Sequence, residues 1–250
     1  MEFEQAIPFL IGAFVVGIFV YNYFFSRNAR INRRLKKAPW KKLADFKSGD
    51  TAKIVGEIIP IEDEMTAPLS KRKCCHYFID VEQKKSSGKN SHWKTIIQEE
   101  VSTRFLIKDG DRYALVNDIR VMTNIVIDAN FSSGTFDDAA PALESFLKDH
   151  GLQSENWLGL NKSIRYEEGI LEANETVSVL GTGHWKPAAE FDLPAEYGEV
   201  LAIRAADDSY VYLSDDPETT EKNVIRPKAK PDSKSKRSKY YRTPNGTVGH

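Results

Sequence analysis

A run of 20 residues without a charge, Ala6 to Phe25, constrains this chain more than any other feature. Twelve of these residues are Ile, Leu, Val or Phe, and together they favour membrane insertion by roughly 4 to 7 kcal/mol. A helix of this length spans about 30 Å, which matches the hydrocarbon core of a bilayer. The run therefore predicts a transmembrane helix over residues 6–25.

Two other interpretations of the run are weaker. A cleaved signal peptide needs a basic region before the apolar run and small residues at a cleavage site. Here Glu2 and Glu4 precede the run, and Phe24-Phe25-Ser26-Arg27 follows it. A buried helix of a soluble protein would show a polar face, which this run lacks. We therefore favour an uncleaved anchor.

The net charge of −1 conceals a strong segregation of charge along the chain. Residues 27–47 contain nine basic residues and one acidic residue, whereas residues 48–224 contain 18 basic and 32 acidic residues. The positive-inside rule places the basic juxtamembrane segment, residues 26–47, in the cytoplasm. We therefore expect a single-pass protein of the cell (inner or plasma) membrane, with residues 1–5 outside and the body in the cytoplasm.

The basic segment is expected to contact anionic lipid headgroups, each charge adding about 1 kcal/mol near the surface. The residues expected to face lipid are Arg27, Arg30, Arg33, Arg34, Lys36 and Lys37. Nucleic-acid binding is the alternative, but lipid competes for the same charges. The acidic body should be repelled by anionic lipid, which leaves its surface available to a protein partner.

Short apolar runs separated by turn residues indicate a mainly β (α+β) domain over residues 48–215. Asp109-Gly110 between two apolar runs is the strongest hairpin signal. Residues 84–90, rich in Lys and Ser, predict a solvated loop. One inserted helix is expected over Ala139 to Lys148, ending at Gly151.

Leu143, Phe146 and Leu147 would share one face of this helix, and Asp137 or Asp138 would cap it. Residues 216–250 lose all periodicity and carry many Lys, Ser and Pro residues. They predict a disordered basic tail.

The sequence contains no nucleophile elbow, no His-Glu-x-x-His motif and no P-loop. Cys74 and Cys75 precede His76, but neighbouring residues of a strand point to opposite faces, and the other histidines are isolated. We therefore identify no catalytic residue, no metal site and no cofactor. Free thiols at Cys74 and Cys75 suit a cytoplasmic domain.

Several motifs occur in an order that resembles the GIDE/MULAN family, whose shared region is the BAM ("beside a membrane") domain. The resemblance covers roughly residues 40–215 and is carried by the segments 67–77, 105–110, 165–171 and 177–181. Its motif residues are Pro68, Cys74, Tyr77, Trp93, Phe105, Asp109, Gly110, Arg165, Glu168, Leu171 and Gly181. The family tends to place Gly three residues after Leu171, where this chain has Asn174, which tolerates a left-handed backbone.

Mitochondrial members of that family are RING-type E3 ubiquitin ligases with two transmembrane helices. With one apolar run and two cysteines, this chain instead resembles the RING-less prokaryotic relatives. The resemblance implies a membrane-anchored interaction or sensing module without chemistry of its own. Ligase-related activity by family inheritance is one alternative, and electrostatic lipid or nucleic-acid binding through the basic flanks is another.

The motif residues also have interpretations of their own. Large aromatic residues such as Tyr77, Trp93 and Phe105 would anchor a small β core. Arg165 and Glu168 are expected to form a partly buried pair that orients the chain before Leu171. The alternative is that this pair lines a groove for a ligand or partner.

Overall fold

The structure, a computed structural model, describes residues 26–87, 90–132, 141–152 and 163–222. This part of the chain is mainly β, as the alternating patterns predict. The strands are β1 (Thr51–Pro60), β2 (Met65–Thr66), β3 (Lys73–Cys74), β4 (His76–Ser87), β5 (Asn90–Ser102), β6 (Phe105–Asp109), β7 (Arg112–Val116), β8 (Val121–Asn124), β9 (Ala129–Ser132), β10 (Ile164–Leu171), β11 (Thr176–Pro187), β12 (Glu199–Arg204) and β13 (Val211–Ser214). The helices are α2 (Arg27–Lys37), α3 (Pro141–Asp149) and α4 (Pro217–Thr220), with short 3-10 turns η1 (Leu43–Asp45), η2 (Ala188–Phe191) and η3 (Ala195–Tyr197).

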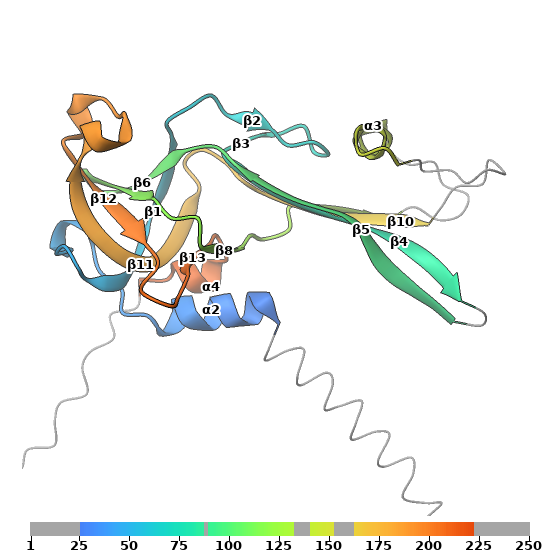
Figure 1. The fold of residues 1–250 in the computed structure, drawn as a ribbon, viewed down its shortest axis with the longest axis horizontal. Coiled ribbons are helices and arrows are strands. Elements are labelled where there is room, and N and C mark those ends of the chain that lie inside the picture. Colours follow the sequence, from blue (N-terminus) through green and yellow to red (C-terminus); the bar gives the residue numbers. More distant parts are fainter. Residues whose placement is uncertain (1–25, 88–89, 133–140, 153–162, 223–250) are drawn as a thin grey trace, which may run out of the picture.

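Five strands close into a small barrel (Figure 1). Around the barrel β1 pairs with β6, β6 with β7, β7 with β12, β12 with β11, and β11 again with β1. The β7–β12 pair is parallel and the other four pairs are antiparallel. This order, with the parallel pair between the third and the fifth barrel strand of the chain, is that of a Greek-key barrel of the OB type.

Two insertions into the barrel build a second sheet. The first, β2 to β5, lies between β1 and β6 in the chain, and the second, β8 to β10 with α3, lies between β7 and β11. From these insertions β5, β4, β10 and β9 pair in that order, all antiparallel. Figure 1 shows β4 and β5 extending far from the barrel as a long hairpin.

Helix α3 lies on one face of the second sheet and confirms the predicted inserted helix. Leu143, Phe146 and Leu147 are buried in a cluster with Ile79 and Val81. At its end the N–H of Gly151 (φ +69°) bonds to the carbonyl of residue 148, and the N–H of residue 152 bonds to that of residue 147. This Schellman arrangement confirms the predicted stop at Gly151. The proposed caps, residues 137–138, lie outside the described residues.

Two predicted turns are also confirmed. Asp109 pairs with Arg112 across the β6–β7 hairpin, and Gly110 takes a φ of +62°. Asn174, which stands where the family resemblance expects Gly, takes a φ of +66°. An asparagine tolerates this left-handed conformation, so the turn between β10 and β11 is kept.

The predicted loop over residues 84–90 is wrong. β4 continues to Ser87 and β5 resumes at Asn90, so this polar stretch forms the outer end of the hairpin. Lys84 and Lys85 are both exposed there. The residues are polar because this end of the ribbon is solvated, and not because the chain leaves the sheet.

The folded unit is also wider than the predicted domain 48–215. Before it, α2 packs on the barrel, and Leu43 and Phe46 belong to the barrel core. After it, α4 lies within the predicted tail. The predicted span over residues 6–25 lies outside the described residues. Among the residues that are described, no helix has both the length and the apolar character needed to cross a bilayer.

Candidate functional site

Helix α2 carries the basic residues that the sequence assigns to lipid. Ser26 begins the helix, and its Oγ accepts a hydrogen bond from the N–H of Ala29 at 3.2 Å. Ile31 and Leu35, four residues apart, lie on one face and are both 0% exposed. The juxtamembrane segment is therefore a packed helix over residues 27–37 and not a free tether.

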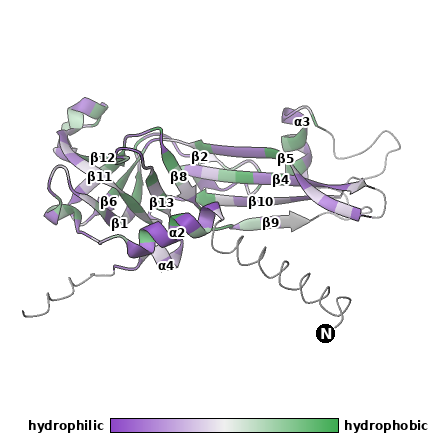
Figure 2. Cartoon of the chain, turned by 60° about the horizontal axis from the view of Figure 1, so that its bottom comes forward, coloured by the Kyte–Doolittle hydropathy of each residue, from purple (hydrophilic) through white to green (hydrophobic). Residues whose placement is uncertain are grey.

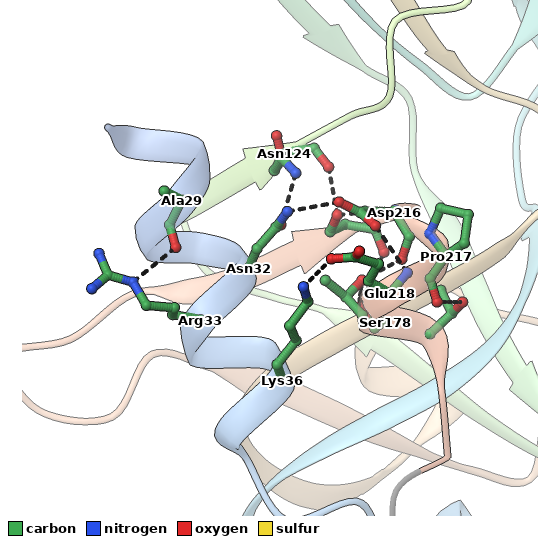
Figure 3. A network of polar contacts seen from close by, with 12 residues as sticks. Ala29, Asn32, Arg33, Lys36, Asn124, Ser178, Asp216, Pro217 and Glu218 are labelled. Atoms are coloured by element: carbon green, nitrogen blue, oxygen red, sulfur yellow. Dashed lines mark hydrogen bonds and ion pairs between the residues drawn. The ribbon is translucent and has the colours of Figure 1, made fainter. Parts of the chain in front are cut away.

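Helix α2 lies against β8 and β13, the strands that extend the barrel sheet beside β11. Asn32 connects the helix to both sides of this surface (Figure 3). Its Nδ2 donates to Oδ2 of Asp216 at 2.6 Å, and its Oδ1 accepts from Nδ2 of Asn124 at 2.8 Å. Lys36 forms an ion pair with Glu218 of α4. These contacts hold α2 against the last described helix of the chain.

A buried lysine holds α4 in place from beneath. Lys53 of β1 is 0% exposed, and its Nζ donates to the carbonyl oxygens of Thr219 at 2.7 Å and Glu221 at 3.0 Å. Burial lowers the pKa of Lys53, and the charge of Glu221 opposes that shift. A buried ammonium group is tolerated only when its N–H groups have hydrogen-bond acceptors. Lys53 therefore couples the barrel wall to the C-terminal end of α4.

The basic residues of α2 lie away from the barrel. Arg30, Arg34 and Lys37 recur at helical spacing and are exposed. In the described part of the chain none of the three has an ion-pair partner. Figure 2 shows α2 mostly in the hydrophilic colour. Of the remaining predicted residues, Arg27 lies 3.7 Å from Glu100, Lys36 pairs with Glu218, and Arg33 Nε donates to the carbonyl of residue 29.

The family-motif residues are distributed over both cores and do not form one site. Phe105 and Leu171 belong to the barrel core, whereas Cys74 and Tyr77 belong to the core under α3. The Tyr77 hydroxyl donates to Glu99. A Cβ at Gly181 would lie 2.5 Å from Cγ2 of Ile203, so close packing of β11 on β12 requires glycine there.

The predicted Arg165–Glu168 pair is wrong. The two residues are three positions apart on β10, and they face opposite sides of the sheet because strand residues alternate. Arg165 pairs with Glu82, and its guanidinium lies 4.5 Å from the ring centroid of Trp93. Glu168 instead binds the chain that leads into β3.

Glu168 holds the loop that contains Pro68. It is 0% exposed, and its two carboxylate oxygens accept hydrogen bonds from the N–H groups of Leu69 at 2.9 Å and Ser70 at 2.7 Å. The loop carries Lys71 at a φ of +61°. Glu168 therefore ties the β2–β3 hairpin to the second sheet, which is a structural role.

Cys74 and Cys75 are free and buried: Cys74, the last residue of β3, lies in the core under α3, and Cys75, between β3 and β4, lies in the barrel core. Burial raises the pKa of Cys74 to about 11 and also raises that of Cys75. We predict that neither thiol of the folded full-length chain reacts with Ellman's reagent at neutral pH, and that both react after denaturation. A Ser48→Cys variant, whose added thiol is exposed, is the control that must react in the native state. If the native thiols react as fast as that control, the predicted burial is wrong.

A cleft of about 930 Å³ lies among the described residues, and sequence reasoning missed it. It lies where the end of β5 meets the ends of β7 and β12 and the segment before β8. Its polar groups come from His76, Glu100, Arg104, Arg120 and Arg204, among others. These residues are far apart in the chain, so no local pattern could have joined them.

The loop between β7 and β8 forms one wall of the cleft. Asp118 accepts hydrogen bonds from the N–H of Arg120 at 2.8 Å and of Ala205 at 2.9 Å, which lower the pKa of Asp118 together with the Arg120 charge. These bonds fix the loop to the end of β12. They also leave Ile119, at the cleft, 100% exposed.

His76 lies at the inner side of the cleft with Glu100. His76 is 5% exposed, and its Nε2 lies 3.5 Å from Oε1 of Glu100 without a hydrogen-bond partner. Burial lowers the pKa of His76 to about 4, although the charge of Glu100 opposes the shift. The ring is therefore neutral at physiological pH.

Searches of protein-family models, of curated proteins and of solved structures found no match to this chain. Within the described ranges, no three His, Cys, Asp or Glu side chains gather as a metal site would require. Function must therefore be argued from α2 and the cleft.

Proposed function

We propose that this chain is a single-pass, membrane-anchored binding module whose folded body stands on the cytoplasmic face of the cell membrane. One observation carries the proposal: the basic segment that directly follows the apolar run is a helix packed on the barrel. A charged tether would leave the body free to move away from the bilayer. A docked α2 instead gives the body a defined basic face next to the predicted span.

The second sheet offers a surface for a protein partner. Its face away from α3 carries Asp80, Glu82 and Glu167, with Arg165 paired to Glu82 on the same face, and these residues alternate with the buried residues of the other face. Anionic lipid repels such a face, so it remains available to a basic surface of another protein. The mode of action proposed here is binding and not catalysis, and resemblance to the RING-less relatives of the GIDE/MULAN family supports the same role.

Cysteine labelling in intact cells tests the orientation. Asp111→Cys places a thiol on the exposed turn between β6 and β7, while the native cysteines are buried. We expect an impermeant maleimide to label this variant only after the cells are lysed. Labelling before lysis would place the body outside and contradict the proposal.

A fluorescence experiment tests whether α2 faces the bilayer. A fluorophore is attached at Arg30→Cys on α2 or at Glu196→Cys on η3, both exposed, in full-length protein reconstituted in nanodiscs. Figure 1 shows α2 along the bottom of the barrel and the β11–β12 connection, which contains η3, at its top. A nitroxide on the lipid headgroups should quench the α2 fluorophore more strongly. Equal quenching at both positions would contradict the proposed docking.

A further inference from the structure

We infer that the cleft beside β5 binds a small amphipathic anion, a molecule that joins a carboxylate or phosphate group to an apolar part. Its volume of about 930 Å³ lies within the usual range of small-molecule sites. The inference does not depend on the membrane anchor, since every residue that carries it belongs to the folded body.

The positive charge at the cleft points to an anion. Arg104, Arg120 and Arg204 all line it, although the body as a whole is acidic. The side chains of Arg104 and Arg120 are 43% and 45% exposed while they are also held by backbone carbonyls of Phe191 and Asp207. Arg204 is exposed and has no ion-pair partner within the described residues. A guanidinium group that is partly exposed can bind the oxygens of a carboxylate or phosphate group through two parallel hydrogen bonds.

Carboxylates offset two of these three guanidinium charges, since Arg104 lies 3.8 Å from Glu62 and Arg120 is paired with Asp118. Asp118 is occupied by two backbone N–H groups and lies 3.5 Å from Arg120 Nε. Glu100 accepts from the Thr123 hydroxyl and lies 3.7 Å from Arg27. The guanidinium of Arg204 therefore remains available to a ligand.

The apolar part of the ligand is inferred from the other lining residues. Val101, Phe105, Val121 and Phe191 line the cleft, and Ile119 stands fully exposed beside them. A ligand that covers this exposed isoleucine removes apolar surface from water, which favours binding. The side chain of His76, which is 5% exposed, also lines the cleft.

Binding of anilinonaphthalene sulfonate, an aromatic anion whose fluorescence rises in apolar sites, tests the inference. Full-length chain in phosphatidylcholine nanodiscs is titrated with the probe, and empty nanodiscs provide the background. We expect saturable binding that weakens about tenfold in Arg204→Ala and also in Ile119→Ser. Arg112→Ala is the matched control, because Arg112 is exposed but stacks over Trp185 outside the cleft. The control should bind as the wild type does.

Competition separates the two parts of the ligand. Octanoate, which has both an apolar chain and an anion, should displace the probe at concentrations about tenfold lower than octanol or inorganic phosphate does. Comparable displacement by phosphate would overturn the apolar part, and comparable displacement by octanol would overturn the anionic part. Absence of saturable probe binding, or equal binding by wild type and both cleft variants, would overturn the inference as a whole.

The source of the anion is decided by a second set of nanodiscs that contain phosphatidylglycerol. If membrane lipid occupies the cleft, octanoate will displace less probe there, because the cleft is already filled. If the ligand is a soluble metabolite, the probe and octanoate will compete as they do in phosphatidylcholine. These outcomes are independent of the labelling and quenching results, so the inference and the proposed function can fail separately.

Discussion

Replacing Glu168 by alanine is expected to lower the free energy of unfolding by about 3 kcal/mol or more. The carboxylate is 0% exposed and is the acceptor for two backbone N–H groups, those of Leu69 and Ser70. Without it, both donors lose their partner next to the core under α3. Hydrogen bonds to a charged group contribute more than neutral ones, and a buried donor without an acceptor is costly.

Chemical denaturation of the full-length chain measures this effect, with Glu167→Ala as the matched control. Glu167 is the preceding residue on β10, but its side chain is exposed on the opposite face. We expect the control to change stability by less than about 0.5 kcal/mol. Glu168→Gln, which keeps one acceptor oxygen, should fall between the two. Equal stabilities of Glu168→Ala and Glu167→Ala would show that the carboxylate does not hold the loop.

Limited trypsin digestion gives a second and local readout. The loop held by Glu168 is followed by Lys71, Arg72 and Lys73, all exposed. In the Glu168→Ala variant this segment should be cleaved earlier than in the wild type, because the backbone N–H groups that anchor it are released. Unchanged cleavage at these residues would contradict the role assigned to Glu168.

Replacing Asp215 by asparagine is expected to change the pH dependence of stability. Asp215 is 8% exposed and accepts hydrogen bonds from the N–H of Val126. Burial raises the pKa of Asp215 to about 7, with a smaller contribution from the charge of Glu175. The ordinary value for an unfolded aspartate is 3.8. At a pH between these two pKa values, the carboxyl group of Asp215 keeps its proton in the native state and has released it in the unfolded chain.

The stability that comes from this retained proton is complete below about pH 4 and is lost as the pH rises towards 7. His76 acts in the opposite direction. Burial lowers the pKa of His76 from 6.5 to about 4, so the unfolded chain binds the extra proton and stability rises with pH across that interval. In the wild type the two slopes therefore oppose each other.

Asp215→Asn removes one slope and leaves the other. The difference in the free energy of unfolding, variant minus wild type, should rise by up to about 1.4 kcal/mol per pH unit between pH 4 and 7. Above about pH 7 this difference should be constant. Denaturation of both chains across this range measures the difference. Asp208→Asn, the same replacement at an exposed position, is the control and should show no such trend. A difference that does not vary with pH would contradict the raised pKa of Asp215.

Local patterns were enough to predict the elements whose geometry depends on nearby residues. Asp109-Gly110 predicts its hairpin because the turn needs a residue that accepts a positive φ. The spacing of Leu143, Phe146 and Leu147 predicts helix α3, because residues three and four apart share a face. Cys74 and Cys75 lie in different cores, as adjacent residues of an extended chain should, although Cys75 falls between β3 and β4.

Local patterns failed where a residue's partner comes from a distant segment. The partners of Glu168, Leu69 and Ser70, lie 99 and 98 residues earlier in the chain. Residues 27–37 look like a basic tether in sequence, because Ile31 and Leu35 are their only large apolar residues. The acceptors for Lys53 lie in a segment whose composition predicts disorder.

The sequence by itself determined the alternation of buried and exposed residues, the tight turns, and the separation of an acidic body from its basic flanks. It also determined the apolar run over residues 6–25, since a charge-free segment of bilayer length is recognisable without any partner. Only the tertiary structure decided that α2 docks on the barrel and that His76, Glu100 and Arg204 meet in one cleft. The reason is physical: backbone conformation and burial follow from near neighbours, whereas a binding site is formed by side chains that the barrel closure and its two insertions bring together.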